Sequence, residues 1–255
     1  MAKATLSPTC CQSRIRSANP GEPSDLPSLS RQHVNQSSAE FSQTLDKAIR
    51  WVIYLGVPSA IGLFMLAEPI ITTLFSSEKF VVRDIQMSSL SLMAYSFGLL
   101  GFILVKVLVP GFFSRQDTKT PVKIGVVALL VNMVFNILIV VPWYMLGYEG
   151  AHAGLAIATS ISAATNAYLL YKTLRKLGVY QPSPGWSRVW LQVVMANMVM
   201  LLVLWWGQHS LEHWLMWTTW ERVMQLLSSI VLAMLAYFLS LFLLGVKIKT
   251  FLPSK

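Results

Sequence analysis

Six long apolar segments constrain the fold of this chain more than any other feature of its sequence. Each holds roughly the 20 residues that a helix needs to cross the hydrocarbon core of a bilayer. Because lipid offers no hydrogen-bond partners, the backbone must bond internally, and this predicts helices. The predicted spans are residues 49–76, 87–112, 122–146, 151–172, 189–207 and 222–246.

The composition also indicates an all-α integral membrane protein. Hydrophobic residues make up 55% of the chain and charged residues only 12%, whereas soluble domains carry about 25% charge. A net charge of +9 can indicate a nucleic-acid partner. Here the basic residues lie between apolar spans, where orientation in the membrane explains them. We therefore expect a protein of the bilayer that binds no nucleic acid.

The flanking segments are polar. Residues 1–24 are predicted to be a disordered leader, residues 25–48 a cytoplasmic segment that leads into the first helix, and residues 247–255 a cytoplasmic tail. The first two segments lack the apolar stretch of a signal peptide, so the first span is expected to direct insertion. Cys10 and Cys11 are adjacent, a spacing that favours neither a disulfide nor a zinc site.

The distribution of positive charge predicts the topology. Sixteen of the 20 Lys and Arg residues fall in the N-terminal segment, in alternate links and in the tail. Three fall in the opposite links, and Lys106 lies inside a span. Because cytoplasmic loops are enriched in Lys and Arg, both termini are predicted to be cytoplasmic.

Two charged residues within spans are candidate substrate contacts, because charge in the membrane is costly and is often functional. Lys106 can extend to the cytoplasmic interface, or it can face an aqueous cavity and meet an anionic substrate. Glu68 precedes Pro69, so it can cap a broken helix or line an outer mouth. Arg115, in the link after Lys106, completes the predicted substrate-binding set.

Amide and hydroxyl groups gather in the third and fourth spans. Asn132 and Asn136 are four residues apart and share a helix face, and Thr159 lies in the next span. Such groups often join membrane helices by hydrogen bonds, which is the simpler interpretation. Alternatively, their oxygens converge on a cation such as Na⁺. Neither span contains a carboxylate, so a Na⁺ site here is expected to be weak.

Three prolines lie within the predicted spans. Pro58, Pro69 and Pro110 are expected to kink their helices, as is frequent in transporters.

The sequence contains none of the common catalytic motifs. No Ser/His/Asp set, HExxH motif or P-loop occurs in it. We therefore expect no enzyme, no metal centre and no cofactor, with Na⁺ or the membrane potential as a possible driving force.

The sequence VKVLVPGFFSRQDTKTPVKIG, residues 105–125, resembles a signature of the MurJ (MviN) family of lipid II flippases. Segments 26–31, 95–107 and 154–171 agree with this family as well. The residues that match the signature are Lys106, Pro110, Gly111, Phe112, Arg115, Gln116, Asp117, Thr120, Pro121 and Val122.

The resemblance implies a function. Members of this family have fourteen spans in two lobes and move undecaprenyl-pyrophosphate-linked peptidoglycan precursor across the bacterial inner membrane. By the resemblance, spans 189–207 and 222–246 line a groove for the polyprenyl tail. The chain resembles the last six of the fourteen spans, without the part whose arginines bind the pyrophosphate. We therefore expect that it does not transport alone.

Several partners and alternatives stay open. A separate N-terminal half or cell-wall synthesis proteins are possible partners, beside the polyprenyl-linked lipid and the bilayer. A flippase for another polyprenyl-linked oligosaccharide has the same pattern of spans. A non-transporting membrane scaffold that binds cell-wall enzymes through its loops is the alternative from a different functional class.

Overall fold

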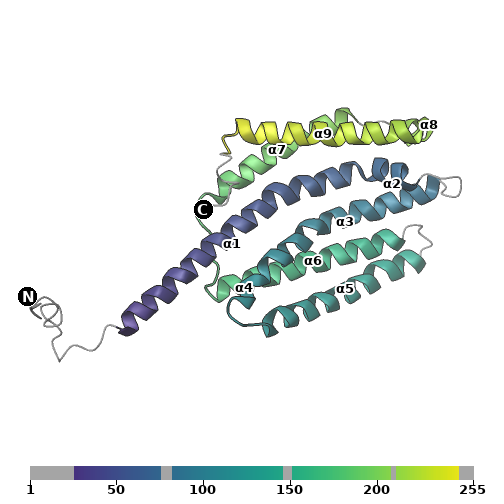
Figure 1. Ribbon diagram of the computed structural model, residues 1–255. Helices are drawn as coiled ribbons and strands as arrows, with labels where there is room; N and C mark the ends of the chain where they lie inside the picture. The colour runs from purple at the N-terminus through teal and green to yellow at the C-terminus, as the bar shows by residue number, and fades with distance from the viewer. Residues whose placement is uncertain (1–25, 76–81, 146–150, 208–210, 247–255) are drawn as a thin grey trace, which may run out of the picture. The chain divides into compact units, whose positions relative to one another are not determined.

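The computed structural model describes residues 26–75, 82–145, 151–207 and 211–246 (Figure 1). The chain divides into two units, residues 1–40 and 41–255. In the first unit only the helical stretch 26–40 is described, and every contact below lies in the second unit. The predicted leader and tail, residues 1–24 and 247–255, lie outside the described residues.

Within these ranges every element is a helix. The helices are α1 (Leu26–Met65), α2 (Ala67–Phe75), α3 (Val82–Leu108), α4 (Pro110–Phe113), α5 (Lys119–Met145), α6 (Ala151–Lys176), α7 (Trp186–Trp206), α8 (Leu211–Met216) and α9 (Thr219–Leu243).

Six helical segments are long and apolar enough to cross a membrane, which confirms the predicted number of spans. Most boundaries shift by a few residues, and the exception is the first span, which runs from Ala39 to Met65 rather than from residue 49 to residue 76. The short helix α8 lies between the last two spans. The spans are Ala39–Met65, Val82–Phe113, Lys119–Met145, His152–Lys176, Trp186–Trp206 and Thr219–Leu243.

The first predicted span is broken in two, and proline explains the break. α1 ends at Met65 and α2 begins at Ala67. Pro69 has no N–H to donate to the carbonyl of Met65, four residues earlier, and its ring crowds the preceding turn. The backbone bonds from Leu66 N to Gly62 O and from Ile70 N to Leu66 O, both 2.9 Å, limit the break to a local kink.

Small residues bring α3 and α6 close together. The Ser160 hydroxyl on α6 donates to the carbonyl of Ala94 on α3 across 2.7 Å. A Cβ atom added to Gly101 would lie 2.9 Å from the backbone of Ala163. Since hydrophobic burial does not drive helices together in lipid, close backbone packing of this kind is how they associate.

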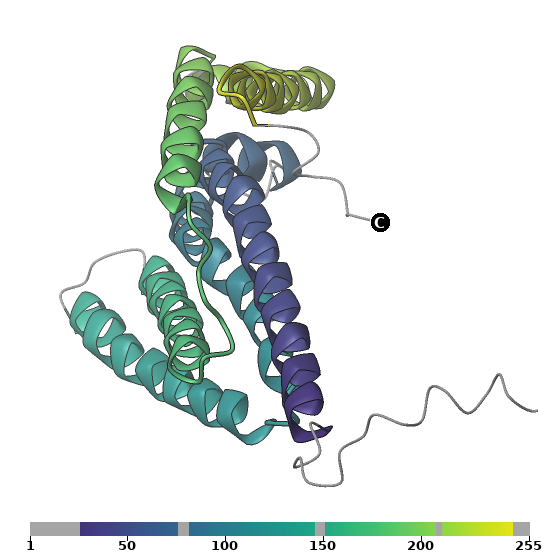
Figure 2. The same cartoon turned by 90° about the vertical axis from the view of Figure 1, so that its left-hand side faces the viewer.

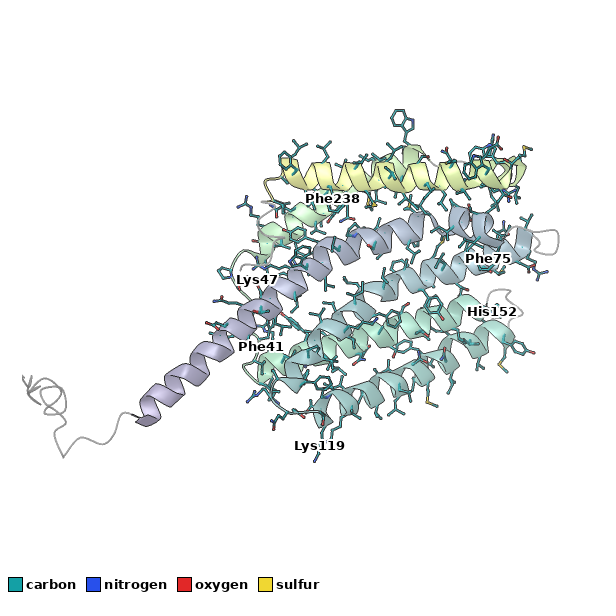
Figure 3. The ribbon with its side chains drawn as sticks, in the orientation of Figure 1. Phe41, Lys47, Phe75, Lys119, His152 and Phe238 are labelled. Atoms are coloured by element: carbon teal, nitrogen blue, oxygen red, sulfur yellow. The ribbon has the colours of Figure 1, made fainter. Side chains whose placement is uncertain are left out.

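α5 packs on the other side of α6. The Ser162 hydroxyl on α6 donates to the Ala128 carbonyl on α5 across 2.6 Å. Lys119 and His152 mark opposite ends of this antiparallel pair (Figure 3). Most of the outer surface of α5 is exposed and apolar, as a lipid-facing helix requires.

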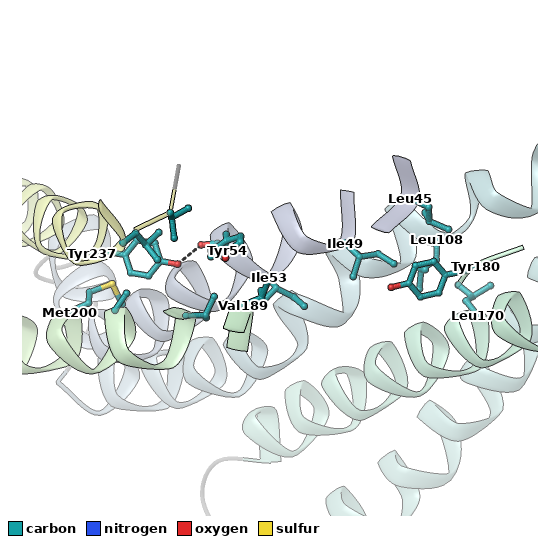
Figure 4. Packing of buried hydrophobic residues seen from close by; sticks show 14 of the residues in the cluster. Leu45, Ile49, Ile53, Tyr54, Leu108, Leu170, Tyr180, Val189, Met200 and Tyr237 are labelled. Atoms are coloured by element: carbon teal, nitrogen blue, oxygen red, sulfur yellow. Dashed lines mark hydrogen bonds between the residues drawn. The ribbon is translucent and has the colours of Figure 1, made fainter. Parts of the chain in front are cut away.

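α7 and α9 form a second antiparallel pair, joined through α8 (Figures 1 and 2). A capping box begins α9, in which Thr218 and Glu221 bond reciprocally to each other's backbone. The part of α1 that follows Phe41 contributes to one buried core with residues of both helix groups, from Leu45 near Leu108 and Leu170 to Tyr54 near Tyr237 (Figure 4).

Candidate functional site

An apolar groove runs between α1 and α9, with a cavity volume of about 320 Å³. We call it the α1–α9 groove. Its polar groups are already bonded within the protein: the Ser59 hydroxyl donates to the Leu55 carbonyl at 2.7 Å, and the Tyr237 hydroxyl donates to the Tyr54 carbonyl at 2.6 Å. The groove is lined by Leu55, Pro58, Ser59, Gly62, Leu63, Leu66, Ile70, Met200, Ile230, Ala233, Met234, Tyr237 and Phe238.

The resemblance implied that spans 189–207 and 222–246 line a groove for the polyprenyl tail. In the α1–α9 groove α9 forms one wall and α7 contributes Met200, so a tail groove lined by both spans stays a prediction. The second half of α1 forms the wall opposite α9. The physical reason is that Tyr237 on α9 hydrogen-bonds to α1, so that α9 faces α1 across the groove.

A larger recess of about 750 Å³ lies between α1, α3, α6 and the start of α7. Three of its aromatic rings carry a cation over one face. The Lys172 ammonium lies 5.9 Å from the Tyr168 ring centroid, the Arg175 guanidinium 5.9 Å from that of Tyr171, and the Arg50 guanidinium 5.3 Å from that of Trp186. The recess is therefore apolar inside and cationic at one end.

A buried carboxylate organises that cationic end. Asp46 on α1 is 2% exposed. Its Oδ1 accepts hydrogen bonds from the Tyr180 hydroxyl at 2.7 Å and from the Trp186 indole at 3.1 Å. Its Oδ2 accepts from Nε of Arg50 at 2.9 Å. Arg50 in turn donates to the carbonyls of Ser183 and Pro184.

These contacts tie the link 177–185 to α1. The Ser42 hydroxyl adds to them by accepting from Gln181 N at 2.9 Å. Burial raises the pKa of Tyr180 well above its ordinary value, and the hydrogen bond to Asp46 raises it further. Tyr180 therefore stays a neutral donor to the carboxylate at physiological pH.

A second buried network joins α1, α7 and α9. The Tyr54 hydroxyl on α1 donates to Oε1 of Gln192 on α7 across 2.8 Å. Nε2 of Gln192 donates to the Leu244 carbonyl at the end of α9 across 3.1 Å. With the bond from Tyr237 to the Tyr54 carbonyl, a connected set of polar contacts links the three helices.

The family signature forms a turn. Arg115 donates from Nη1 to the Leu177 carbonyl at 3.2 Å, just beyond the end of α6. Gln116 adopts a left-handed backbone with φ of 58°. Asp117 Oδ1 accepts from Thr120 N at 3.0 Å at the start of α5, and hydrogen bonds from Thr120 hold the pKa of this carboxyl below its ordinary value.

The predicted substrate-binding residues are not brought together at one site. Lys106 is exposed in the last turn of α3. Leu104 and Leu108 line the recess, and Lys106, two residues from each, lies on a different helix face. Glu68 is half-buried in the first turn of α2, where a negative charge is favourable. A role for Lys106, Arg115 or Glu68 in substrate binding stays a prediction.

Asn132, Asn136 and Thr159 do lie together. Nδ2 of Asn132 donates to the Thr159 hydroxyl at 3.3 Å, and Nδ2 of Asn136 donates to Oδ1 of Asn132 at 2.8 Å. The Thr159 hydroxyl donates to the Leu155 carbonyl at 2.8 Å. Oδ1 of Asn136 is buried without a hydrogen-bond partner. In the described part of the chain, no three His, Cys, Asp or Glu side chains gather as metal ligands would.

Sequence reasoning missed Asp46, Tyr54, Gln192 and Tyr237. Two local signals could have indicated the first two. Asp46 and Arg50 are four residues apart and thus neighbours on a helix. Pro58 stands four residues after Tyr54, whose carbonyl therefore loses its usual helical donor. No local signal marks Gln192 or Tyr237, because their hydrogen-bond partners lie 52 or more residues away in sequence.

Comparison with known proteins shows which family the chain resembles. A family model described as "Lipid II flippase MurJ" matches residues 25–226. The chain is 43% identical over 226 residues to the probable lipid II flippase MurJ of Vibrio cholerae, a match over 88% of this chain and 41% of the relative. Identity to the relative of Haemophilus influenzae with the same description is 41% over 228 residues, with coverage of 87% and 43%. The lipid II flippase MurJ of Burkholderia cenocepacia is 39% identical over 227 residues, with coverage of 87% and 42%.

The chain thus spans less than half the length of these curated relatives. A solved structure described as lipid II flippase MurJ in an inward closed conformation superposes with a TM-score of 0.58 at 22% identity. The superposition covers 78% of this chain and 38% of the solved chain. At this identity the likeness supports the fold, an all-α membrane domain.

Proposed function

Because the chain belongs to the lipid II flippase MurJ family, we propose that it forms the polyprenyl-binding part of a lipid II flippase. In this role it takes part in moving undecaprenyl-pyrophosphate-linked peptidoglycan precursor across the bacterial inner membrane. The α1–α9 groove carries the proposal. It is an apolar groove between two membrane-spanning helices, and its polar groups are bonded within the protein, as a site for an isoprenoid requires.

The placement of charge supports an orientation with both termini in the cytoplasm. Lys47 and Lys119 lie toward one end of the helices, and Phe75 and His152 lie toward the other (Figure 3). Arg115 shares the first end, because it bonds to Leu177 after α6. The positive-inside rule assigns this end to the cytoplasm. Fusions of a reporter enzyme to residue 255 test the assignment, since cytoplasmic reporter activity is expected.

We propose that the chain alone does not transport. Alternating access requires two groups of helices that rock against each other around a site. The chain spans 41% of its Vibrio cholerae relative, and an N-terminal half supplied by another chain is the proposed partner. Cell-wall synthesis proteins are further candidate partners.

A chimaera tests both statements. Residues 25–255 of this chain replace the matching segment of the Vibrio cholerae relative, and the product is expressed in cells depleted of their own flippase. Growth is expected from the chimaera and not from this chain alone. Growth with the chain alone contradicts the need for a partner, whereas a membrane-inserted chimaera that fails to support growth contradicts the flippase role.

A different lipid-linked sugar remains the alternative within the same membrane-transport class. The precursor that accumulates during depletion separates the two cases. Lipid II accumulation supports the proposal, and accumulation of another polyprenyl-linked oligosaccharide contradicts it. A scaffold without transport activity predicts instead that cell-wall enzymes co-purify with the chain and that no polyprenyl lipid does.

A further inference from the structure

Pro58 creates an unusual acceptor in the middle of α1. In a regular helix the carbonyl of Tyr54 bonds to the N–H of residue 58. Proline has no N–H, so this helical bond cannot form. The site is deep in the bundle, where a buried carbonyl is costly to leave without a donor.

Tyr237 supplies a donor from another helix. Its hydroxyl lies 2.6 Å from the Tyr54 carbonyl oxygen, and the dashed line in Figure 4 marks this bond. Tyr237 is 2% exposed, so its hydroxyl depends on a partner within the protein. The bond thus joins a position on α9 to the one turn of α1 where proline removes the helical donor.

The same bond lies beside the α1–α9 groove. Pro58 and Leu55 line the groove on α1, and Ala233, Met234 and Tyr237 line it on α9. Tyr237 is thus part of the groove lining on α9, and its hydroxyl bonds to α1, which forms the opposite wall. A hydrogen bond between the walls fixes their separation more sharply than apolar contacts, which are non-directional.

We propose that Tyr237 is a positioning residue for the polyprenyl tail: by bonding to the Tyr54 carbonyl across from Pro58, it sets the width of the α1–α9 groove. This inference rests on the proposed function and adds the device that shapes its lipid site. Tyr237 acts through α1, and the apolar tail lies against its ring.

A distance measurement tests the device without any lipid. Cys10 and Cys11 are the two native cysteines and are replaced by serine. Spin labels are placed at Phe64→Cys on α1 and Leu235→Cys on α9, both exposed and outside the groove lining. Electron spin resonance then reports the distribution of distances between α1 and α9. Tyr237→Phe is expected to broaden this distribution and shift it to longer distances.

Two further variants separate the bond from general packing. Tyr54→Phe removes a hydroxyl that bonds to Gln192 on α7, yet it leaves the Tyr54 carbonyl and its bond to Tyr237 in place, so the distribution between α1 and α9 is expected to shift less than in Tyr237→Phe. Pro58→Ala restores an N–H that competes for that carbonyl. Pro58→Ala is expected to shift the distribution to longer distances, as Tyr237→Phe does. The double variant Pro58→Ala/Tyr237→Phe is expected to shift it no further than the larger of the two single changes.

Lipid binding tests the use of the device. The full chain is placed in nanodiscs and titrated with undecaprenyl phosphate. Because Tyr237→Phe loses one hydrogen bond that positions the groove, it is expected to bind the lipid between about two-fold and ten-fold more weakly than the wild type, and Tyr54→Phe is expected to lose less affinity than Tyr237→Phe.

The outcomes separate the inference from the proposed function. A wild-type chain that does not bind undecaprenyl phosphate contradicts the proposed function and the lipid-positioning role together. A wild-type chain that binds, with Tyr237→Phe unchanged in either distance or affinity, overturns the inference alone. Equal effects of Tyr54→Phe and Tyr237→Phe also overturn it, because they indicate general loosening of the core.

Discussion

The Tyr180 hydroxyl donates to Asp46 Oδ1 across 2.7 Å and joins the link between α6 and α7 to α1. The two residues are 134 positions apart in sequence. Since Asp46 also bonds to Arg50 and Trp186, one carboxylate fixes the start of α7 against α1. This buried cluster therefore constrains how the start of α7 meets α1.

Replacement of Asp46 tests the cluster. Asp46→Asn keeps an oxygen for Tyr180 but removes the charge that faces Arg50. The expected loss is about 1–3 kcal/mol in the free energy of unfolding, because hydrogen bonds to a charged group are stronger than neutral ones. Unfolding in detergent is measured for Asp46→Asn, Tyr180→Phe and the double variant. The two losses are expected to add incompletely, and full additivity contradicts a direct bond.

Gly101 provides a second prediction, on the packing of α3 against α6. A Cβ at this position meets the Ala163 backbone at 2.9 Å, and backbone cannot rotate away. Gly101→Ala is therefore expected to lower the free energy of unfolding by about 1–3 kcal/mol, as overpacking does. Gly125 on α5 is the matched control, since nothing lies within 4 Å of its added Cβ. Gly125→Ala is expected to stabilise by about 0.5–1 kcal/mol, and equal losses at both positions contradict the packing argument.

The cluster of Asn132, Asn136 and Thr159 gives a third prediction. Its side chains bond mainly to one another, which favours helix packing over cation binding. Asn132→Leu removes both bonds and is expected to lower stability by about 0.6 kcal/mol, the usual size for polar pairs between membrane helices. The loss is expected to be the same in NaCl and KCl. A wild-type midpoint of unfolding that rises in NaCl alone, and no longer does so in Asn132→Leu, identifies a Na⁺ site instead.

The sequence predicted the spans well because the bilayer imposes one strong local rule, a run of apolar residues at each crossing. It predicted the break near Pro69 for an equally local reason. The groove and the Asp46 cluster escaped prediction because each depends on contacts between distant positions. Tyr54 and Tyr237 are 183 residues apart, and neither carries a local pattern that indicates the other.

The family signature shows a different limit of sequence reasoning. Residues 115–117 belong to the signature that the family resemblance rests on, yet the structure places them in a turn, where Arg115 bonds to Leu177 just after α6 and Asp117 bonds to Thr120 at the start of α5. A distinctive motif is thus no guide to the lipid site by itself. The residues that line the α1–α9 groove are ordinary apolar ones.

Asp117 gives a prediction on pH. The hydrogen bonds from Thr120 lower the pKa of Asp117 in the folded chain, so the ionised carboxylate stabilises the fold. This contribution is fully present above the ordinary pKa of an aspartate, and it is lost as the pH falls through the lowered folded value. The midpoint of thermal unfolding of Asp117→Ala is therefore expected below that of the wild type at pH 7, with the two converging at acid pH. A constant difference across the pH range contradicts a role for the charge.

Gln116 carries the last prediction, since its φ of 58° places a residue with a side chain in the left-handed region. This conformation costs an ordinary residue roughly 1–2 kcal/mol, whereas glycine adopts it freely. Gln116→Gly removes this conformational cost, but glycine loses more chain entropy on folding. The variant is therefore expected to raise the free energy of unfolding by about 0.5–1 kcal/mol. Gln116→Val is expected to destabilise, because a β-branched side chain fits this region poorly. Chemical unfolding is measured for the three proteins. The variant with Gly at position 116 is expected to be the most stable and the one with Val the least, and any other order contradicts a strained turn.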